Sequence, residues 1–224
     1  MPDSNIDKDF LYYVLADDDF FTYSMATSKG TKMPRGDKVS IMQYEVPLFD
    51  LHTQKKIASI LKSLDEKIEL NNKINNNLEQ QAQEIYQQMF IDNAASNWKE
   101  GTLSDIADII MGQSPSGSSY NEESIGTIFF QGRAEFGFRF PTVRLFTTEP
   151  KRMACANDTL TSVRAPVGDL NVAHTDCCIG RGLAAIHSKT NHQSFVLYTM
   201  FSLKKQLDVL MEKVLFLDQS TETH

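Results

Sequence analysis

The sequence predicts an α+β fold in which one long coiled-coil helix is joined to a mixed α/β domain. Two patterns lead to this fold class. Apolar residues recur on a seven-residue repeat between residues 57 and 89, and after residue 101 the pattern changes to short apolar runs separated by glycine, proline and serine. The chain has 224 residues, enough for one globular domain and a long helix.

The long helix is the clearest element. Its apolar positions follow one another in steps of four and three, the spacing of a coiled-coil seam, and two seam positions are asparagines. A buried asparagine in a seam fixes register and partner at some cost in stability. At about 1.5 Å of rise per residue, a helix over residues 51–91 is about 60 Å long. The predicted seam consists of Ile57, Leu61, Leu64, Ile68, Asn71, Asn75, Leu78, Ala82, Ile85 and Met89.

Local signals set the ends of this helix. Pro47 disfavours helix in the residue before it, and Asp50 is the expected N-cap. Residues 46–92 therefore hold a short extended lead-in and the helix. Residues 93–101 are polar and form a hinge that contains the only tryptophan, Trp98.

The region after the hinge, residues 102–213, has the pattern of a mixed α/β domain. Leu103 to Ile110 begins it, and a helix is expected over residues 195–210. Three apolar runs between turn residues predict short strands. These runs are residues 127–130, 159–163 and 183–186.

The region before the long helix, residues 1–45, contains an aromatic amphipathic segment, Phe10–Phe21, which is expected to be helical. Residues 10–15 align with residues 195–200 at an offset of 185 residues, and each stretch opens an amphipathic helix. Any two amphipathic helices look alike, so an internal repeat needs a second argument.

Composition excludes several classes of protein. No apolar run is long enough to span a membrane, and the first residues do not resemble a secretory signal, so a cytoplasmic location is expected. Cys155, Cys177 and Cys178 are odd in number and form no Cys-x-x-Cys pair. His174 stands beside Asp176 and Cys177, but no second ligand pair lies at zinc spacing. We expect neither a disulfide framework nor a metal.

Catalytic motifs are also absent from the sequence. A DNA adenine methyltransferase needs a glycine-rich cofactor loop and an Asn/Asp-Pro-Pro-aromatic site, and neither occurs. Asp65-Glu66-Lys67 resembles a nuclease motif, but these residues fall on the exposed face of the helix and are expected to be solvated charges. The loop over residues 112–120 lacks the Gly-Lys-Ser/Thr of a phosphate loop. We predict no catalytic residue and no cofactor.

Charge is distributed unevenly along the chain. The net charge of −7 argues against a free-standing DNA clamp, because non-specific affinity comes mainly from lysine and arginine contacts with phosphates. Six of the seven arginines nevertheless lie between residues 133 and 181, where seven basic residues face five acidic ones. Arginine's planar fork reads guanine edges and phosphates. Ordinary surface ion pairs are the alternative explanation.

The turns in this arginine-rich stretch supply the candidate DNA contacts. Residues 131–137 follow an expected strand and carry side chains that pair with adenine, guanine and cytosine, although a plain surface loop is the alternative. Residues 162–171 and 180–182 are similar turns, in which glycines serve the backbone and arginines serve phosphates. The candidate DNA-binding residues are Gln131, Arg133, Glu135, Arg139, Arg144, Arg164 and Arg181.

A family resemblance connects these elements. Residues 54–58, 64–71 and 74–75, with residues 30–35 upstream and 103–107 downstream, closely resemble the central conserved region of specificity subunits of type I restriction-modification systems. The resemblance implies a non-catalytic subunit. In that family, two target-recognition domains each read half of a split double-stranded DNA sequence, and two long antiparallel helices hold the domains apart. Methyltransferase subunits dock on the helices, and the restriction subunit joins through them.

The resemblance also implies a division of the chain. Residues 1–45 correspond to the C-terminal remnant of a first target-recognition domain, residues 46–92 to the central conserved helix, and residues 102–213 to an incomplete second target-recognition domain. The offset of 185 residues fits the two-fold pseudo-repeat of this family. Residues 214–224 stand where the family has a different segment, and we expect them to be an out-of-frame tail of a frameshifted gene, which sequencing of the locus would decide.

Three interpretations remain at this stage. The chain is either a type I DNA-specificity subunit, or a natural truncation of one, that binds DNA within a complex, or it is a half-subunit that self-associates through residues 57–89 and reads a palindromic split site. A structural coiled-coil protein without a DNA role is the third interpretation, and the arginine cluster argues against it.

Overall fold

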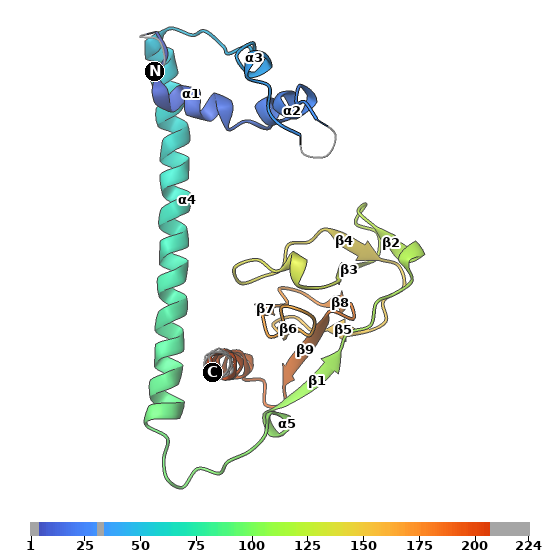
Figure 1. Ribbon diagram of the computed structural model, residues 1–224. Coiled ribbons are helices and arrows are strands. Elements are labelled where there is room, and N and C mark those ends of the chain that lie inside the picture. The colour runs from blue at the N-terminus through green and yellow to red at the C-terminus, as the bar shows by residue number, and fades with distance from the viewer. Residues whose placement is uncertain (1–4, 31–33, 207–224) are drawn as a thin grey trace, which may run out of the picture. The chain divides into compact units, whose positions relative to one another are not determined.

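The computed structural model describes residues 5–30 and 34–206 (Figure 1). The predicted tail at residues 214–224 therefore lies outside the described residues. The chain divides into two compact units, Met1–Leu78 and Glu79–His224, which we describe separately. No helix in the described ranges combines the length and apolar character needed to cross a membrane.

The first unit consists of α1 (Lys8–Leu15), α2 (Asp18–Ala26), α3 (Lys38–Ile41) and the first part of α4 (Leu51–Tyr86). Each of the three short helices begins at an aspartate whose carboxylate accepts backbone N–H groups. The predicted helical segment Phe10–Phe21 is thus two helices, because Asp17 caps a new helix after α1 has ended.

The docking of α1 on α4 depends on a buried amide. Gln54 is fully buried, and its side-chain oxygen accepts from the backbone N–H of Asp7 at 2.8 Å. Its side-chain nitrogen donates to the backbone oxygens of Asn5 and Phe49, at 3.1 and 2.7 Å. Phe10 and Ala58 are buried beside it. The amide therefore satisfies three backbone groups that packing removes from water.

The long helix begins where the sequence predicts. Asp50 accepts from the backbone N–H of Thr53 at 3.0 Å and from its hydroxyl at 2.6 Å, as an N-cap does. After 36 residues, α4 continues directly into a π-helical turn, Gln87–Asp92. The expected helix over residues 51–91 is confirmed in extent, with a change of winding in its last turn.

The second unit contains the end of α4, the short helix α5 (Leu103–Ile106) and two sheets. One sheet has the order β1-β9-β6-β7 and is antiparallel throughout. The other has the order β2-β4-β3-β8-β5, with β3 and β8 parallel. Their bounds are β1 Ala107–Met111, β2 Tyr120–Asn121, β3 Thr127–Phe130, β4 Leu145–Thr147, β5 Met153–Ala154, β6 Thr159–Ser162, β7 Leu170–Val172, β8 Cys177–Ile179 and β9 Leu183–Ser188.

Both sheets contribute to the core. Phe130 and Ile179 from one sheet pack with Leu160 and Leu183 from the other, and all four are fully buried. On β9, Ile186 joins a second cluster with Val196, because side chains of a strand alternate between its two faces. The four-stranded sheet therefore has a sheet on one face and a helix on the other.

That helix begins at residue 193, two residues before the predicted start at residue 195, and is described to residue 206. It packs on the end of α4 through aromatic side chains. The ring of Phe195 lies 4.9 Å from that of Phe90, and the hydroxyls of Tyr86 and Thr199 are 2.9 Å apart. The second unit thus holds its domain against the last turns of the long helix.

Candidate functional site

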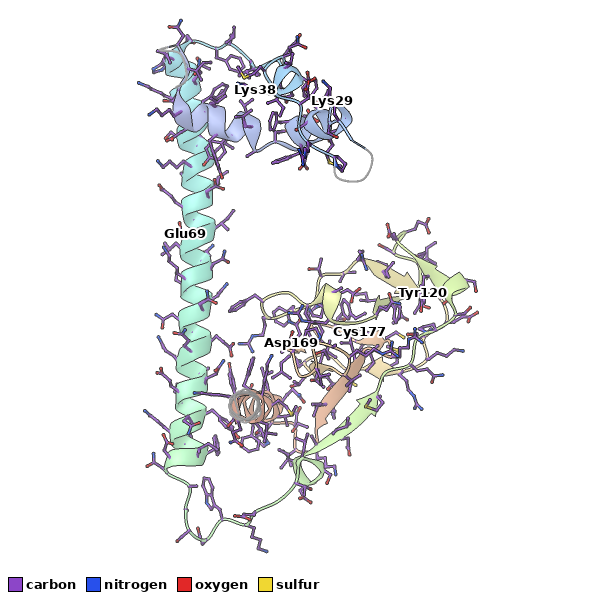
Figure 2. All side chains as sticks on the ribbon, in the orientation of Figure 1. Lys29, Lys38, Glu69, Tyr120, Asp169 and Cys177 are labelled. Atoms are coloured by element: carbon purple, nitrogen blue, oxygen red, sulfur yellow. The ribbon has the colours of Figure 1, made fainter. Side chains whose placement is uncertain are left out.

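The loop after β3 places Arg133 in a small ionic network. Arg133 lies in a short 3-10 turn and its side chain is 54% exposed. Its Nε donates to the carboxylate of Asp169, which also accepts from Nζ of Lys204. These bonds from Lys204 and Arg133 hold the pKa of Asp169 below its usual value. Figure 2 labels Asp169, which lies between the two cations.

Glu135 has a different environment from the other candidates. It is buried, its carboxylate accepts from the backbone N–H of Gly132 at 3.0 Å, and it pairs with Arg144 at 3.1 Å. The Glu135 carboxylate therefore stabilises the turn. The Arg144 side chain remains 60% exposed.

Arg139 lies against the long helix. Its guanidinium pairs with Glu79 and donates to the Tyr198 hydroxyl at 3.3 Å, and about a quarter of the side chain is exposed. The contact joins the loop after the 3-10 turn to α4 and to the helix that begins at residue 193, all within the second unit.

The turn that carries Arg164 is closed by Ser162. The Ser162 hydroxyl donates to the backbone oxygen of Pro166 at 2.7 Å and accepts from the backbone N–H of Asp169 at 3.0 Å. Gly168 has a φ of +88°, which favours glycine. Arg164 is exposed at the tip of this turn.

The turn that carries Arg181 approaches the β3 loop closely. A Cβ at Gly180 or Gly182 would lie 2.9 Å from the backbone oxygen of Gln131, so both positions require glycine. The backbone oxygen of Gly182 accepts from Val163, and Arg181 N–H donates to the Ser114 hydroxyl at 3.2 Å.

Three turns that are distant in sequence therefore meet. We call the exposed side chains that these turns carry the arginine-loop surface, which consists of Gln131, Arg133, Arg164 and Arg181. Backbone contacts join the Gln131 loop to the Gly182 turn and the Gly182 turn to Val163, and the Arg133–Asp169 pair joins the first loop to the third. Within the described ranges, no ion pair engages the side chains of Arg164 and Arg181.

Sequence reasoning missed two members of the ionic network. Asp169 and Lys204 are 35 residues apart, and Asp169 and Arg133 are 36 apart, so no local pattern connects them. Asp169 stands in a recognised turn, whereas Lys204 lies on a helix whose sequence reads only as amphipathic.

The predicted seam has one covered end and a long exposed stretch. Ile57 and Leu61 are half-buried next to α1, whereas Leu64, Ile68 and Leu78 are each more than half exposed. Asn71 and Asn75 are exposed between them, Ala82 is half-buried, and Ile85 and Met89 are exposed. Exposed apolar side chains on either side of the two asparagines indicate an interaction surface along this face of the helix.

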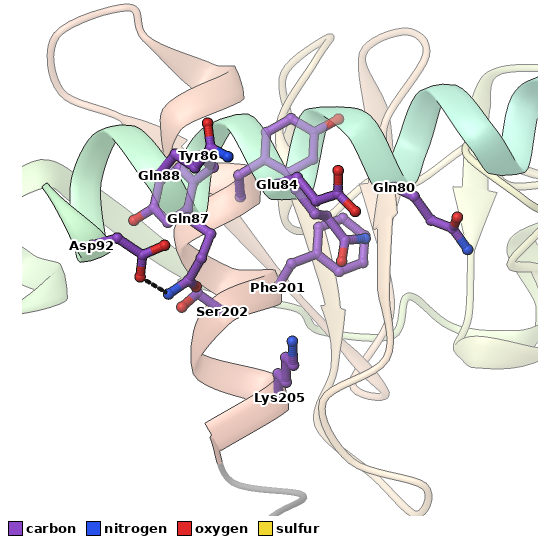
Figure 3. Close-up of a pocket in the computed structure, with 11 residues that line it drawn as sticks. Gln80, Glu84, Tyr86, Gln87, Gln88, Asp92, Phe201, Ser202 and Lys205 are labelled. Carbon is purple, nitrogen blue, oxygen red and sulfur yellow. Dashed lines mark hydrogen bonds between the residues drawn. The ribbon is translucent and has the colours of Figure 1, made fainter.

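A polar cavity of about 350 Å³ lies between the end of α4 and the helix from residue 193 (Figure 3). Gln80, Glu84 and Lys205 line it, and Gln87 donates to Asp92 at 2.9 Å. None of the candidate DNA-binding residues lines this cavity.

The chain thus combines a long helix that carries an apolar seam with a domain that presents arginines on converging loops. The family model described as the type I restriction modification DNA specificity domain matches residues 1–80. A putative type I restriction enzyme MjaX specificity subunit of Methanocaldococcus jannaschii is 35% identical over 192 residues, which cover 78% of this chain and 45% of that protein. Over most of its length, the chain is similar to specificity subunits of type I restriction-modification systems.

Solved structures show the same similarity. The HsdS subunit from Thermoanaerobacter tengcongensis is 33% identical, with a TM-score of 0.50, and the match covers 91% of this chain and 54% of that one. The S subunit of a type I system from M. genitalium has the same fold, with a TM-score of 0.54, 19% identity and coverage of 92% and 57%. The chain therefore spans about half the length of the relatives that it matches.

Proposed function

We propose that this chain acts as a DNA-specificity subunit, or as part of one, that reads half of a bipartite target through its second unit. The arginine-loop surface is the observation that carries the proposal. It brings Gln131, Arg133, Arg164 and Arg181 together from three turns on a glycine-fixed backbone. The subunit itself supplies no catalytic residue, and a cytoplasmic location follows from a DNA partner.

The side chains of this surface suit base and phosphate recognition. Arginine pairs in two-pronged fashion with guanine, and glutamine does so with adenine. Arg133 is held in one orientation by Asp169, which prepares it for a specific contact, whereas Arg164 and Arg181 are free of ion pairs within the described residues and suit phosphates. Arg139 and Glu135 are engaged inside the domain, and we assign them a supporting role.

The apolar seam suits a helical partner. Burying a leucine or isoleucine side chain contributes about 1.5 to 3 kcal/mol, and the seam presents several. We infer that the seam, together with its flanking surface, docks methyltransferase subunits, through which the restriction subunit joins the complex.

The test is DNA binding by the complex reconstituted with its methyltransferase subunit. Arg133→Ala is expected to cost about 1 to 3 kcal/mol on the cognate duplex and little on a scrambled one, because a base contact is lost. Arg164→Ala with Arg181→Ala is expected to weaken both duplexes alike and to reduce the salt dependence.

Arg152→Ala is the matched control, because Arg152 is exposed in the same domain but outside the arginine-loop surface. Equal losses on cognate and scrambled DNA for Arg133→Ala would assign that residue to positioning. Unchanged affinity in both the Arg133→Ala variant and the Arg164→Ala/Arg181→Ala double variant would contradict the placement of the DNA on this surface.

A half-subunit that pairs with a second copy is the alternative, and the exposed stretch of the seam favours it. In that arrangement two chains give a two-fold dimer that reads a palindromic split site. Light scattering on the chain alone distinguishes the two: a stable dimer mass supports self-association, and a monomer that assembles only with the methyltransferase subunit supports the first form.

A further inference from the structure

Three side chains with metal-ligand chemistry meet away from the arginine-loop surface. Cys155 follows β5, Asp158 precedes β6, and His187 lies in β9. A ligand atom from each lies within 4.8 Å of those of the other two. The strands come from both sheets, since β5 belongs to the five-stranded sheet and β6 and β9 to the other.

The buried member of this cluster is held from two sides. Asp158 is almost fully buried, and one carboxylate oxygen lies 2.6 Å from Nδ1 of His187. The other oxygen accepts from the backbone N–H of Cys155 at 2.8 Å. The His187 side chain is about half exposed and Cys155 is exposed, so an ion has access to the imidazole and the thiol from solvent.

The donor set matches one class of ion. Zinc binds cysteine sulfur, histidine nitrogen and aspartate oxygen at about 2.0 to 2.3 Å, and two such donors on one tetrahedral ion lie about 3.3 to 3.8 Å apart. The three ligand atoms lie within 4.8 Å of one another, so binding requires the two exposed side chains to move inward by up to about 1 Å. A magnesium or calcium ion would prefer an all-oxygen set, so the thiol and the imidazole favour a zinc-like cation.

We propose that Cys155, Asp158 and His187 form a binding site for a zinc-like divalent cation, with a fourth position open to solvent. This inference goes beyond DNA recognition and differs from the sequence expectation of no metal. His174 is the histidine that the sequence pattern singles out, whereas Asp158 and His187 are 29 residues apart and meet only because β6 pairs with β9. A bound ion would fasten the β5–β6 connection to β9 and so link the two sheets.

A structural hydrogen bond between Asp158 and His187, without any ion, is the competing explanation. Cobalt separates the two, because Co²⁺ takes zinc sites and a cobalt–thiolate bond gives a near-ultraviolet charge-transfer band. The full chain is stripped with a chelator, dialysed and titrated with CoCl₂. We expect one equivalent to bind with that band and with tetrahedral visible bands, and ZnCl₂ to displace both.

The variants target the two exposed ligands, whose replacement leaves the buried Asp158 in place. Cys155→Ser should remove the charge-transfer band, and His187→Ala should weaken cobalt binding at least tenfold. His192→Ala is the matched control, because His192 is an exposed histidine outside the cluster. Circular dichroism confirms that each variant is folded.

A second readout is thermal stability. Saturating ZnCl₂ should raise the Tm of the unaltered chain and of His192→Ala, and should not raise that of Cys155→Ser. Absence of the cobalt band in the unaltered chain, or its persistence in Cys155→Ser, would overturn the site and leave the hydrogen bond as the role of this cluster.

Discussion

At the scale of single residues, Asp169 fixes the orientation of two basic side chains. It accepts from Arg133 and Lys204, and its turn is fixed by Ser162. An arginine held in this way loses less rotational freedom when it meets a base than a free side chain does. Asp169 is thus a positioning residue for Arg133 within the proposed DNA interface.

Asp169→Asn should therefore lower the ratio of cognate to scrambled DNA affinity about tenfold, while binding to scrambled DNA stays equal or increases because a negative charge is removed. Fluorescence anisotropy with the reconstituted complex measures both affinities. Asp108→Asn is the control, since Asp108 is an exposed aspartate that pairs only loosely with Lys189 at 3.5 Å. A ratio that Asp169→Asn leaves unchanged would remove Asp169 from recognition.

The same carboxylate makes stability depend on pH. Its pKa is lowered by the bonds from Lys204 and Arg133, so the pair stabilises the fold above the unfolded pKa of about 3.9 and loses this effect as pH falls through the folded pKa. Urea unfolding should show a gap between the unaltered chain and Asp169→Asn that is full above about pH 5 and shrinks in stronger acid. A gap that is independent of pH would contradict this account.

At the scale of elements, the long helix was largely predictable and the small strands were not. Its N-cap, its periodicity and its length are local signals, and the structure agrees with each. β3, β6 and β9 were also predicted, because their apolar runs are bounded by turn residues. β7 and β8, by contrast, have three residues each, and partners far along the chain define them.

The candidate site also has features that local sequence predicts and features that depend on distant segments. Exposed arginines in glycine turns were identifiable from sequence, and Arg133, Arg164 and Arg181 indeed lie on turns that meet. The burial of Glu135 and the contact of Arg139 with Glu79 were not identifiable, because each depends on how distant segments pack.

The seam gives a prediction for α4. Leu64→Asp with Ile68→Asp should abolish self-association or methyltransferase binding, because charges would replace apolar side chains that a partner helix buries. Light scattering and a pull-down with the methyltransferase subunit measure these properties. Leu70→Asp is the matched control, since Leu70 is equally exposed on α4 but lies outside the seam. Unchanged assembly in the double variant would disprove the seam.

The junction of α1 with α4 gives a second prediction. Gln54→Ala should lower the free energy of unfolding of the first unit by about 2 to 4 kcal/mol, because three buried backbone groups lose their partner. Gln43→Ala, at an exposed glutamine of the same unit, should change it by less than about 0.5 kcal/mol. Denaturant unfolding followed by circular dichroism compares the two variants, and similar losses would show that the buried amide has no special role.

At the scale of the whole molecule, each unit packs an aromatic residue of the predicted repeat beside one end of the long helix. Phe10 packs edge-on at 6.1 Å against Phe49, which precedes α4, and Phe195 contacts Phe90 in the π-helical turn that follows α4. The two stretches that align at an offset of 185 residues thus each supply one of these aromatic contacts. The assignment of residues 1–45 to a first target-recognition domain stays a prediction.

The overall charge bears on DNA binding. A net charge of −7 should leave the isolated chain with weak affinity for non-specific DNA, with a Kd of about 10⁻⁴ M or higher at physiological salt. Assembly with the methyltransferase subunit should strengthen binding by at least tenfold. Titration of a labelled duplex with each sample tests this, and tight cognate binding by the chain alone would show that the arginine-loop surface is sufficient.

Around Gln131, glycine contacts set the backbone shape of the arginine-loop surface, and side chains that play no part in these contacts are available to touch DNA bases. Gly180 and Gly182 fix the backbone by contacts with another backbone, so the shape of the turns owes little to the side chains at positions 131 and 181. Substitutions at those positions should therefore leave the fold unchanged. A library randomised there should retain the fold in most members while its preferred target changes, and this makes the domain a suitable starting point for selecting new specificities.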